Sequence, residues 1–386
     1  MKKIAVITST RAEYGLLSPV IRELRKHESS DFKVELIVTG THLSQDYGFT
    51  INEIKEDKIR IDHEIIISTK SDSANDISAN QADTLIKFTT LFNEEKYSAI
   101  VLLGDRYEIL AVAIAAGNTN TPIFHLCGGD TTEGAKDEWI RHSITKMSYL
   151  HFVTNENSRK RVIQLGEAPN RVFNFGSTSI DNIINIATLS KKAALNSIGL
   201  QDCKYAICTY HPVTMSDEQI DEQMGNFLDA IKAFPKINFI ITKSNADQGG
   251  ALINSLLDDA VQRIKNIKVF SSLGTIRYLS LMKYCEFVLG NSSSGIIEAP
   301  AFHIPTINIG DRQRGRLQAE SIINCDRDTN SIISAINIAL SPEFKSNCLQ
   351  VQSPYGTGNA SKFIANKILE YICQNTIDLR KAFYLT

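Results

Sequence analysis

The chain repeats one pattern along its whole length: a short apolar run, then small polar residues, then a helical periodicity. This repeated pattern restricts the fold more than any other feature. The first run covers residues 4–7; Thr8-Ser9-Thr10 follows it, and helical periodicity then covers 18–27. Continuous apolar runs of this kind are typical of parallel strands buried on both faces. Alternation of such strands with helices predicts an α/β protein with parallel sheets.

The same unit recurs through the first half, and polar residues follow each strand at its carboxyl end. The patterns predict strands over 34–38, 61–67, 99–103, 122–126, 150–153 and 171–175, and helices over 76–92 behind an aspartate cap, over 155–165, and around Arg141-His142.

The second half repeats the rhythm after a change of composition near Gly176-Ser177-Thr178. A chain of 386 residues is too long for one ordinary core, so two domains are the default. We expect domains over 1–176 and 177–358, and a C-terminal helical segment over 359–386 that packs back on the first domain. The predicted elements of the second half are strands over 205–209, 238–242, 268–270, 287–289 and 305–309, and helices over 217–234, 250–264, 275–284, 329–340 and 361–374.

The segment F-V-L-G-N-S-S-S-G-I-I-E-A-P at 287–300 predicts a nucleotide site. A strand that turns through glycines and hydroxyls into a helix aims unpaired N–H groups at one point, which suits a phosphate. Ser292 and Ser293 lie in this turn, and Glu298, about one helical turn later, could accept two ribose hydroxyls. The alternative is that the serines only cap a helix.

Three basic side chains follow other strands. Arg11 is placed to reach a phosphate, Arg312 in G-D-R-Q-R-G-R could contact a phosphate or ribose, and His211 precedes a proline that takes the chain out of the sheet near the serine turn. The alternatives are that the arginines lie on a solvated surface and that the histidine is structural.

The loop at 127–138 offers acids and bases in one short segment: Asp130, Glu133, Asp137 and Glu138. Its three glycines let backbone approach a ligand. So many carboxylates after a strand indicate catalysis, although a solvated acidic loop is the alternative.

Several classes of protein are disfavoured. The chain has neither G-x-G-x-x-G nor a P-loop, and its histidines show no metal-binding spacing, so we expect no cofactor and no metal. A net charge of −2 favours no nucleic acid, and no apolar run approaches the roughly 20 residues of a membrane span. Seven cysteines without C-x-x-C and the absence of a signal-peptide cleavage site predict a cytoplasmic protein with free thiols.

The chain closely resembles the hydrolysing UDP-N-acetylglucosamine 2-epimerases of bacterial sialic acid and capsule biosynthesis. The resemblance covers nearly the whole chain and implies the GT-B fold, in which two Rossmann-like domains with parallel sheets face a central cleft. The motifs that carry it are T-R-A-E-Y-G at 10–15, T-G-T-H-L at 39–43, G-D-R at 104–106, G-G-D-T-T-E-G at 128–134, I-R-H-S-I-T-K at 140–146, N-S-S-S-G-I-I-E-A-P at 291–300 and G-D-R-Q-R-G-R at 310–316.

The resemblance implies a reaction. The C2 proton is removed and UDP leaves C1, giving a 2-acetamidoglucal, and water then adds to give N-acetylmannosamine. The positions that match the family's acids, bases and sugar contacts are Asp105, Asp137, His42 and Arg141; those that match its UDP contacts are Arg11, Ala12, Gly15, His211, Ser292, Ser293, Glu298 and Arg312. We also expect a homo-oligomer, a dimer or tetramer, although the sequence gives neither its size nor any feedback regulation.

One departure concerns Cys127, because many relatives have H-x-E-G-G where this chain has H-L-C-G-G at 125–129. A cysteine replaces a proton-transfer glutamate poorly unless its thiol pKa is lowered. We then expect Asp130, Glu133 or a water to transfer the proton, with His211 as a further candidate.

Other functions stay open. A similar enzyme acts on UDP-2,4-diacetamido-2,4,6-trideoxyglucose for legionaminic acid, and the motifs do not fix the sugar. A GT-B glycosyltransferase would need an acceptor site, often beside a basic or amphipathic surface, and no such stretch stands out. A nucleotide-sugar-binding protein without chemistry would not need Asp105 and Asp137. We therefore favour the epimerase.

Overall fold

The computed structural model describes residues 1–70, 73–132, 137–185, 188–212, 219–244, 249–374 and 377–385. The chain forms two compact units. Unit 1 comprises Met1–Asp130, Asp137–Asn182 and the segment from Tyr355 onward, and unit 2 is formed mainly by Ile183–Pro354. Among the described residues, no helix is long and apolar enough to cross a membrane.

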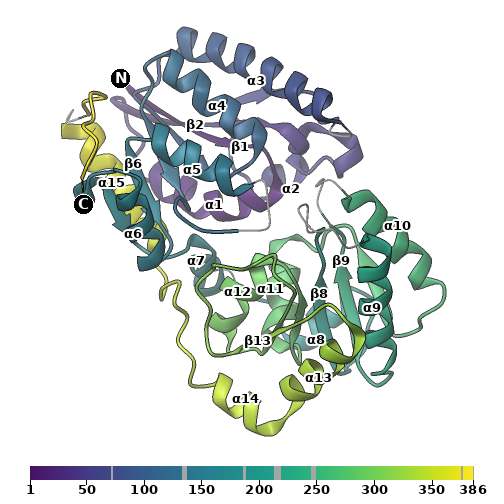
Figure 1. The fold of residues 1–386 in the computed structure, drawn as a ribbon. Coiled ribbons are helices and arrows are strands. Elements are labelled where there is room, and N and C mark those ends of the chain that lie inside the picture. Colours follow the sequence, from purple (N-terminus) through teal and green to yellow (C-terminus); the bar gives the residue numbers. More distant parts are fainter. Residues whose placement is uncertain are drawn as a thin grey trace. The chain divides into compact units, whose positions relative to one another are not determined.

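Unit 1 is built on a seven-stranded sheet in the order β3-β2-β1-β4-β5-β6-β7, with every neighbouring pair parallel (Figure 1). Alternate residues of β1 face opposite apolar clusters: Ile4 packs with α1 and α15, and Ala5 with α3, α4 and α5. The strands are β1 (Lys2–Thr8), β2 (Phe32–Thr39), β3 (His63–Ile65), β4 (Ala99–Leu103), β5 (Ile123–Leu126), β6 (Leu150–Val153) and β7 (Val172–Asn174). The helices are α1 (Arg11–Arg25), α2 (Ile51–Glu56), α3 (Ala74–Glu95), α4 (Tyr107–Asn118), α5 (Asp137–Met147), α6 (Glu156–Gln164), α7 (Thr178–Asn185) and α15 (Ala360–Gln374).

The first helix begins at Arg11, so the prediction of a start at residue 18 is wrong. Thr10 is the N-cap: its side chain accepts a hydrogen bond from the N–H of Glu13, and the Glu13 carboxylate accepts the N–H of Thr10. This reciprocal capping box satisfies two N–H groups that a helix start leaves unpaired. The turn after β1 is therefore only two residues long, and Arg11 lies on the helix.

Other helices differ from the prediction as well, and α2, α7, α8 (Lys191–Asn196) and α14 (Pro342–Cys348) were not predicted. Ser73 caps α3, and Asp76, expected as the cap, completes the capping box three residues later. Helix α4 was not predicted, because eight of its twelve residues are buried and no polar stripe marks a helical period.

The C-terminal segment completes unit 1. Ile368 of α15 lies in the same apolar cluster as Leu17 of α1, and both carboxylate oxygens of Asp181 accept N–H groups from the start of α15. Asn182 donates to the carbonyl of Gly15 at 2.6 Å. Unit 1 consequently extends past the expected boundary at residue 176. The domain bounds 1–176, 177–358 and 359–386 stay a prediction.

Unit 2 contains a six-stranded parallel sheet in the order β10-β9-β8-β11-β12-β13. Apolar clusters join one face to α9, α10 and α13 and the other to α8 and α11. The strands are β8 (Tyr205–Thr209), β9 (Asn238–Thr242), β10 (Ile267–Phe270), β11 (Val288–Gly290), β12 (Thr306–Ile309) and β13 (Ile322–Cys325). The helices are α8 (Lys191–Asn196), α9 (Ile220–Lys232), α10 (Gly250–Val261), α11 (Gly274–Tyr284), α12 (Ser293–Ile297), α13 (Thr329–Leu340) and α14 (Pro342–Cys348).

The prediction of α/β alternation with parallel sheets is confirmed for both units. In each sheet the strand order reverses beside the first strand, between β1 and β4 and between β8 and β11. Ligands of open α/β sheets bind outside the carboxyl ends of the strands at such a switch point. The polar turns after these strands are therefore the candidate half-sites.

Candidate active site

In unit 1, Arg141 anchors the acid that follows β4. Its side chain is only 2% exposed, and it donates to Oδ2 of Asp105 from Nε at 3.0 Å and also from Nη2. Nη1 donates to the carbonyl of Asp130 at 2.8 Å and to Glu138 at 3.2 Å. Charge-assisted bonds of this kind fix both position and ionisation, so Asp105 is held against the first turn and a half of α5.

Asp130 is buried and joins the β5 turn to the next strand. Its Oδ1 accepts from Thr154 at 2.9 Å and from Ser158 at 2.6 Å, and Asn155 lies at 3.5 Å. Gly129 beside it could not carry a side chain, since a Cβ there would lie 2.4 Å from the carbonyl oxygen of Ser158. The carboxylate is therefore a fixed part of the loop.

His42 is completely buried below the surface of the same edge. Its ring nitrogens lie 3.1 Å from the hydroxyl of Thr8 and 2.8 Å from that of Thr50. Burial lowers its pKa to about 4, so the ring is neutral at physiological pH. This geometry favours a supporting role for His42 over direct proton transfer.

His125 of β5 ties two of the turns together. It lies 3.1 Å from the carbonyl oxygen of Gly104 and 3.2 Å from the hydroxyl of Thr145 on α5. Burial lowers its pKa to about 3, so it is a neutral link. Gly128 packs against the pair, because a Cβ at Gly128 would lie 2.9 Å from His125 Nδ1 and from Thr145 Oγ1.

The remaining predicted residues of unit 1 occupy the same edge. Arg11 is half-buried in the first turn of α1, with Ala12 exposed, and Asp137 is half-buried at the start of α5. Open space surrounds the Cα of Gly15, where a Cβ would meet nothing within 4 Å. Glu133 lies outside the described residues.

In unit 2, Asn291 joins the turns after β8 and β11. Its Oδ1 accepts the N–H of His211 at 2.7 Å, and its Nδ2 donates to the carbonyl of His211 at 2.8 Å. The His211 ring lies 3.2 Å from the hydroxyl of Ser244, which follows β9. His211 and the serine turn therefore belong to one constellation.

The serine turn contains a polar chain that ends on Glu298. Ser292 caps α12 by accepting the N–H of Ser294, while Ser293 begins this helix. Tyr278 donates to Ser294 at 2.9 Å, and Ser294 donates to Glu298. Burial raises the pKa of Glu298 to about 7, against the lowering effect of the Ser294 bond.

Arg312 lies over the same turn, since its guanidinium donates to the carbonyl of Asn291 at 3.2 Å. Gln313 donates to that carbonyl at 2.8 Å. The helix after the turn is shorter than expected, five residues before a 3₁₀ turn with Pro300. Hydroxyls, local N–H groups, Arg312 and His211 thus provide anion-binding capacity without a long helix dipole.

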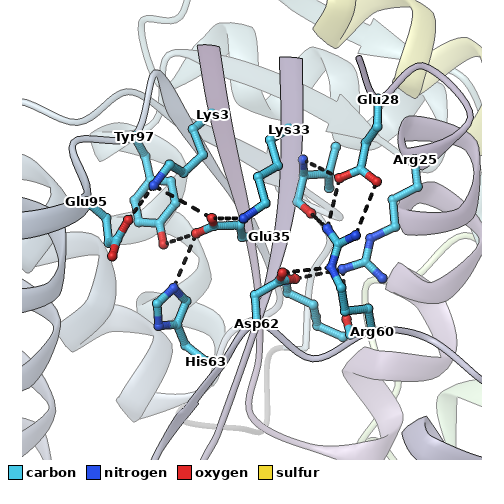
Figure 2. A network of polar contacts seen from close by, with 12 residues as sticks. Lys3, Arg25, Glu28, Lys33, Glu35, Arg60, Asp62, His63, Glu95 and Tyr97 are labelled. Carbon is cyan, nitrogen blue, oxygen red and sulfur yellow. Dashed lines mark hydrogen bonds and ion pairs between the residues drawn. The ribbon is translucent and has the colours of Figure 1, made fainter. Parts of the chain in front are cut away.

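Among the described residues, Glu35, His63 and Glu95 have the spacing of a metal site. Figure 2 shows that lysine side chains already pair with the two carboxylates of this group. Ligand atoms of Glu35, His63 and Glu95 lie within 4.8 Å of one another. Lys33 donates to Glu35 at 2.8 Å, and Lys3 bonds Glu95 and lies 3.6 Å from Glu35. Burial raises the pKa of Glu35, but the hydrogen bonds from Lys33 and Tyr97 outweigh it and lower the pKa to about 2. Two ammonium groups thus supply the positive charge that these carboxylates need.

The residues that hold the site together were not singled out from their sequence motifs: Glu13, Ser9, Glu108, His125, Asn291 and Tyr278. Two carry a recognisable signal. Arg-x-Glu follows both β1, as T-R-A-E, and β4, as D-R-Y-E. The repeat places a glutamate at corresponding points of two neighbouring βα turns.

The fold and the two polar edges define a GT-B protein of the α/β class. A solved UDP-GlcNAc 2-epimerase from Neisseria meningitidis, bound to UDP-GlcNAc, matches with a TM-score of 0.82 over 96% of this chain and 100% of that one, at 21% identity. The model of the UDP-N-acetylglucosamine 2-epimerase family matches residues 22–369, and the chain belongs to this family.

Two relatives are similar in sequence over most of their length. The GDP/UDP-N,N'-diacetylbacillosamine 2-epimerase (hydrolyzing) of Campylobacter jejuni is 40% identical over 90% of this chain and 89% of its own. The polysialic acid biosynthesis protein P7 of Escherichia coli is 37% identical over 100% of this chain and 97% of its own.

Proposed function

We propose that the protein is a hydrolysing 2-epimerase that converts UDP-N-acetylglucosamine to UDP and N-acetylmannosamine. Family membership over residues 22–369 carries the proposal, and a relative named as a hydrolysing enzyme at 40% identity supports the hydrolytic outcome. The relative named for polysialic acid biosynthesis supports a place in sialic acid formation. A cytoplasmic homo-oligomer remains a prediction.

The proposal assigns the nucleotide to unit 2 and the sugar to unit 1. Arg11, His211, Ser292, Ser293 and Arg312 would stabilise the diphosphate as negative charge develops on it. Glu298 would accept the ribose hydroxyls. Ala12 and Gly15 lie in the first helical turns, where the open space at Gly15 lets a ligand approach.

In the first chemical step, a carboxylate from Asp105 or Asp137 removes the C2 proton, and the electron pair forms the C1–C2 double bond as the C1–O bond to UDP breaks. Water then supplies hydroxyl to C1, and an acid delivers a proton to the opposite face of C2. Arg141 holds the Asp105 carboxyl group in place for this task. Asp130 and Glu133 are candidates for the second proton.

A second substrate is favoured by the 40% identical relative, whose name specifies N,N'-diacetylbacillosamine, which is 2,4-diacetamido-2,4,6-trideoxyglucose. The chemistry at C1 and C2 is the same for both sugars. Only contacts to C4 and C6 would distinguish them.

Incubation with each UDP-sugar alone tests the proposal. We expect UDP and free N-acetylmannosamine from UDP-N-acetylglucosamine without any acceptor. Turnover of the diacetamido sugar alone would establish the second substrate instead. Consumption only after addition of an acceptor would indicate a glycosyltransferase, and no consumption of either sugar would overturn the proposal.

A further inference from the structure

A buried pair of carboxyl groups lies where the turns after β1 and β4 meet. The hydroxyl of Ser9 is 2.9 Å from Oε2 of Glu13 and 2.9 Å from Oε1 of Glu108. Ser9 is fully buried, and Glu13 and Glu108 are 5% and 2% exposed. The reaction proposed above uses neither glutamate.

Proton counting shows that these three groups cannot all make their hydrogen bonds with both acids ionised. The Ser9 hydroxyl has one proton and faces two carboxyl oxygens. Oε1 of Glu13 and Oε2 of Glu108 are also buried without a hydrogen-bond partner among the described residues. Two buried carboxylates on either side of one hydroxyl proton would repel each other, and the backbone N–H groups that Oε2 of Glu13 accepts leave Oε1 of Glu13 and Oε2 of Glu108 without compensation.

The charges nearby balance one carboxylate. Arg106 donates from Nε to Oε1 of Glu108 at 2.9 Å. On the β1 side, Glu13 faces the N–H groups of Ser9 and Thr10. His42 donates its backbone N–H to the Ser9 carbonyl, and its ring is neutral at physiological pH.

We propose that Glu13 is held as a neutral carboxylic acid that donates to Ser9, which donates to Glu108, and that this one-proton chain positions the turns carrying Arg11 and Asp105. Arg106, paired with Glu108 at 2.9 Å, then faces one negative charge in this pair of acids and not two. Glu13 is a positioning residue, and its catalytic consequence rests on the proposed function.

The environment of Glu13 agrees with this assignment. Burial, followed by the charge of Glu108, raises its pKa to about 8, although hydrogen bonds from Ser9 and the charge of Arg106 oppose the shift. Loss of the proton above that pH places two negative charges beside Ser9. The turn after β1 and the start of α4 are then driven apart.

The test compares wild type with Glu13→Gln, whose amide can replace the acid's donor. We expect wild-type kcat/KM to fall about tenfold per pH unit above the pKa of Glu13, and Glu13→Gln to change less than about threefold between pH 7 and 9. Glu56→Gln, at an exposed position of α2, is the matched control and should follow wild type. An alkaline fall in Glu13→Gln equal to that of wild type would overturn the proposal.

Two measurements test whether Glu13 is protonated and need no activity assay. Infrared difference spectra between pH 6 and pH 9 should show a larger loss of protonated-carboxyl absorption in wild type and Glu56→Gln than in Glu13→Gln, because Glu298 also titrates in this range. The Tm of wild type should fall relative to Glu13→Gln between pH 6 and 8.5, since a raised folded-state pKa makes folding take up a proton there. An equal loss in wild type and Glu13→Gln would overturn the proposal even if the enzyme proves to have another substrate. If Glu13→Gln does not fold, spectra of Glu298→Gln, which lacks the second titrating carboxyl, decide instead, and no loss of the band in that variant would overturn the proposal.

Discussion

Replacement of Arg141 by methionine tests how the acid after β4 is held. Methionine preserves much of the apolar volume but removes every donor to Asp105, Glu138 and the carbonyl of Asp130. Breaking a buried ion pair costs about 3–5 kcal/mol. Because the Asp105 side chain is 27% exposed, water compensates part of the loss, and we expect a cost of about 2–3 kcal/mol.

This cost corresponds to a fall in Tm of about 5–10 °C for a unit of this size. Scanning calorimetry at pH 7 provides the assay. Arg380→Met is the matched control, because the Arg380–Asp378 pair has side chains 91% and 55% exposed, and its loss should leave Tm unchanged.

A double-mutant cycle sharpens this test. Asp105→Asn should cost less than Arg141→Met, because Arg141 keeps Glu138 and the Asp130 carbonyl. The double variant should be less destabilised than the sum of the two. Equal shifts for Arg141→Met and Arg380→Met, or strict additivity of Asp105→Asn and Arg141→Met, would refute the reasoning.

Three further predictions concern the remaining site residues. Gly290→Ala should prevent stable folding of unit 2, because φ is +138° and a Cβ would lie 2.0 Å from the carbonyl oxygen of Thr209; a soluble variant with wild-type Tm would contradict this. UDP affinity measured by calorimetry should fall by up to about tenfold per pH unit below pH 7, as Glu298 becomes protonated. The Glu298→Gln variant should bind UDP weakly and with a smaller pH dependence. Identical pH profiles of wild type and variant would exclude the Glu298 carboxylate from UDP binding. Asp137→Asn should bind UDP normally but lose about 10²–10⁴-fold in turnover, and full activity would remove it from the chemistry.

Most strands were predictable because a buried parallel strand leaves a direct trace in sequence, although β13 was not predicted. β4, β6, β8 and β9 have the bounds that their apolar runs indicated. The helices were predictable only where one face is polar. α4 is buried nearly all round, so its sequence lacks a helical period, although the helix covers one face of the unit 1 sheet.

The site was predictable in its parts but not in its connections. Asp105, Asp130 and Arg141 were singled out from separate motifs, whereas the hydrogen bonds that join them depend on the order of β4, β5 and β6 in the sheet. Glu13 and Glu108 are 95 residues apart, and only the adjacency of β1 and β4 brings them to Ser9. The repeated Arg-x-Glu was visible, but its meaning required the topology.

The central claim is that the reaction proceeds by loss of the C2 proton and release of UDP, and isotope incorporation tests it most directly. UDP-N-acetylglucosamine is incubated with the enzyme in heavy water, and the free sugar is analysed by NMR and mass spectrometry. The account predicts N-acetylmannosamine with one deuterium at C2 and one equivalent of UDP. A free sugar that retains protium at C2, or N-acetylglucosamine released with its configuration unchanged, would contradict it.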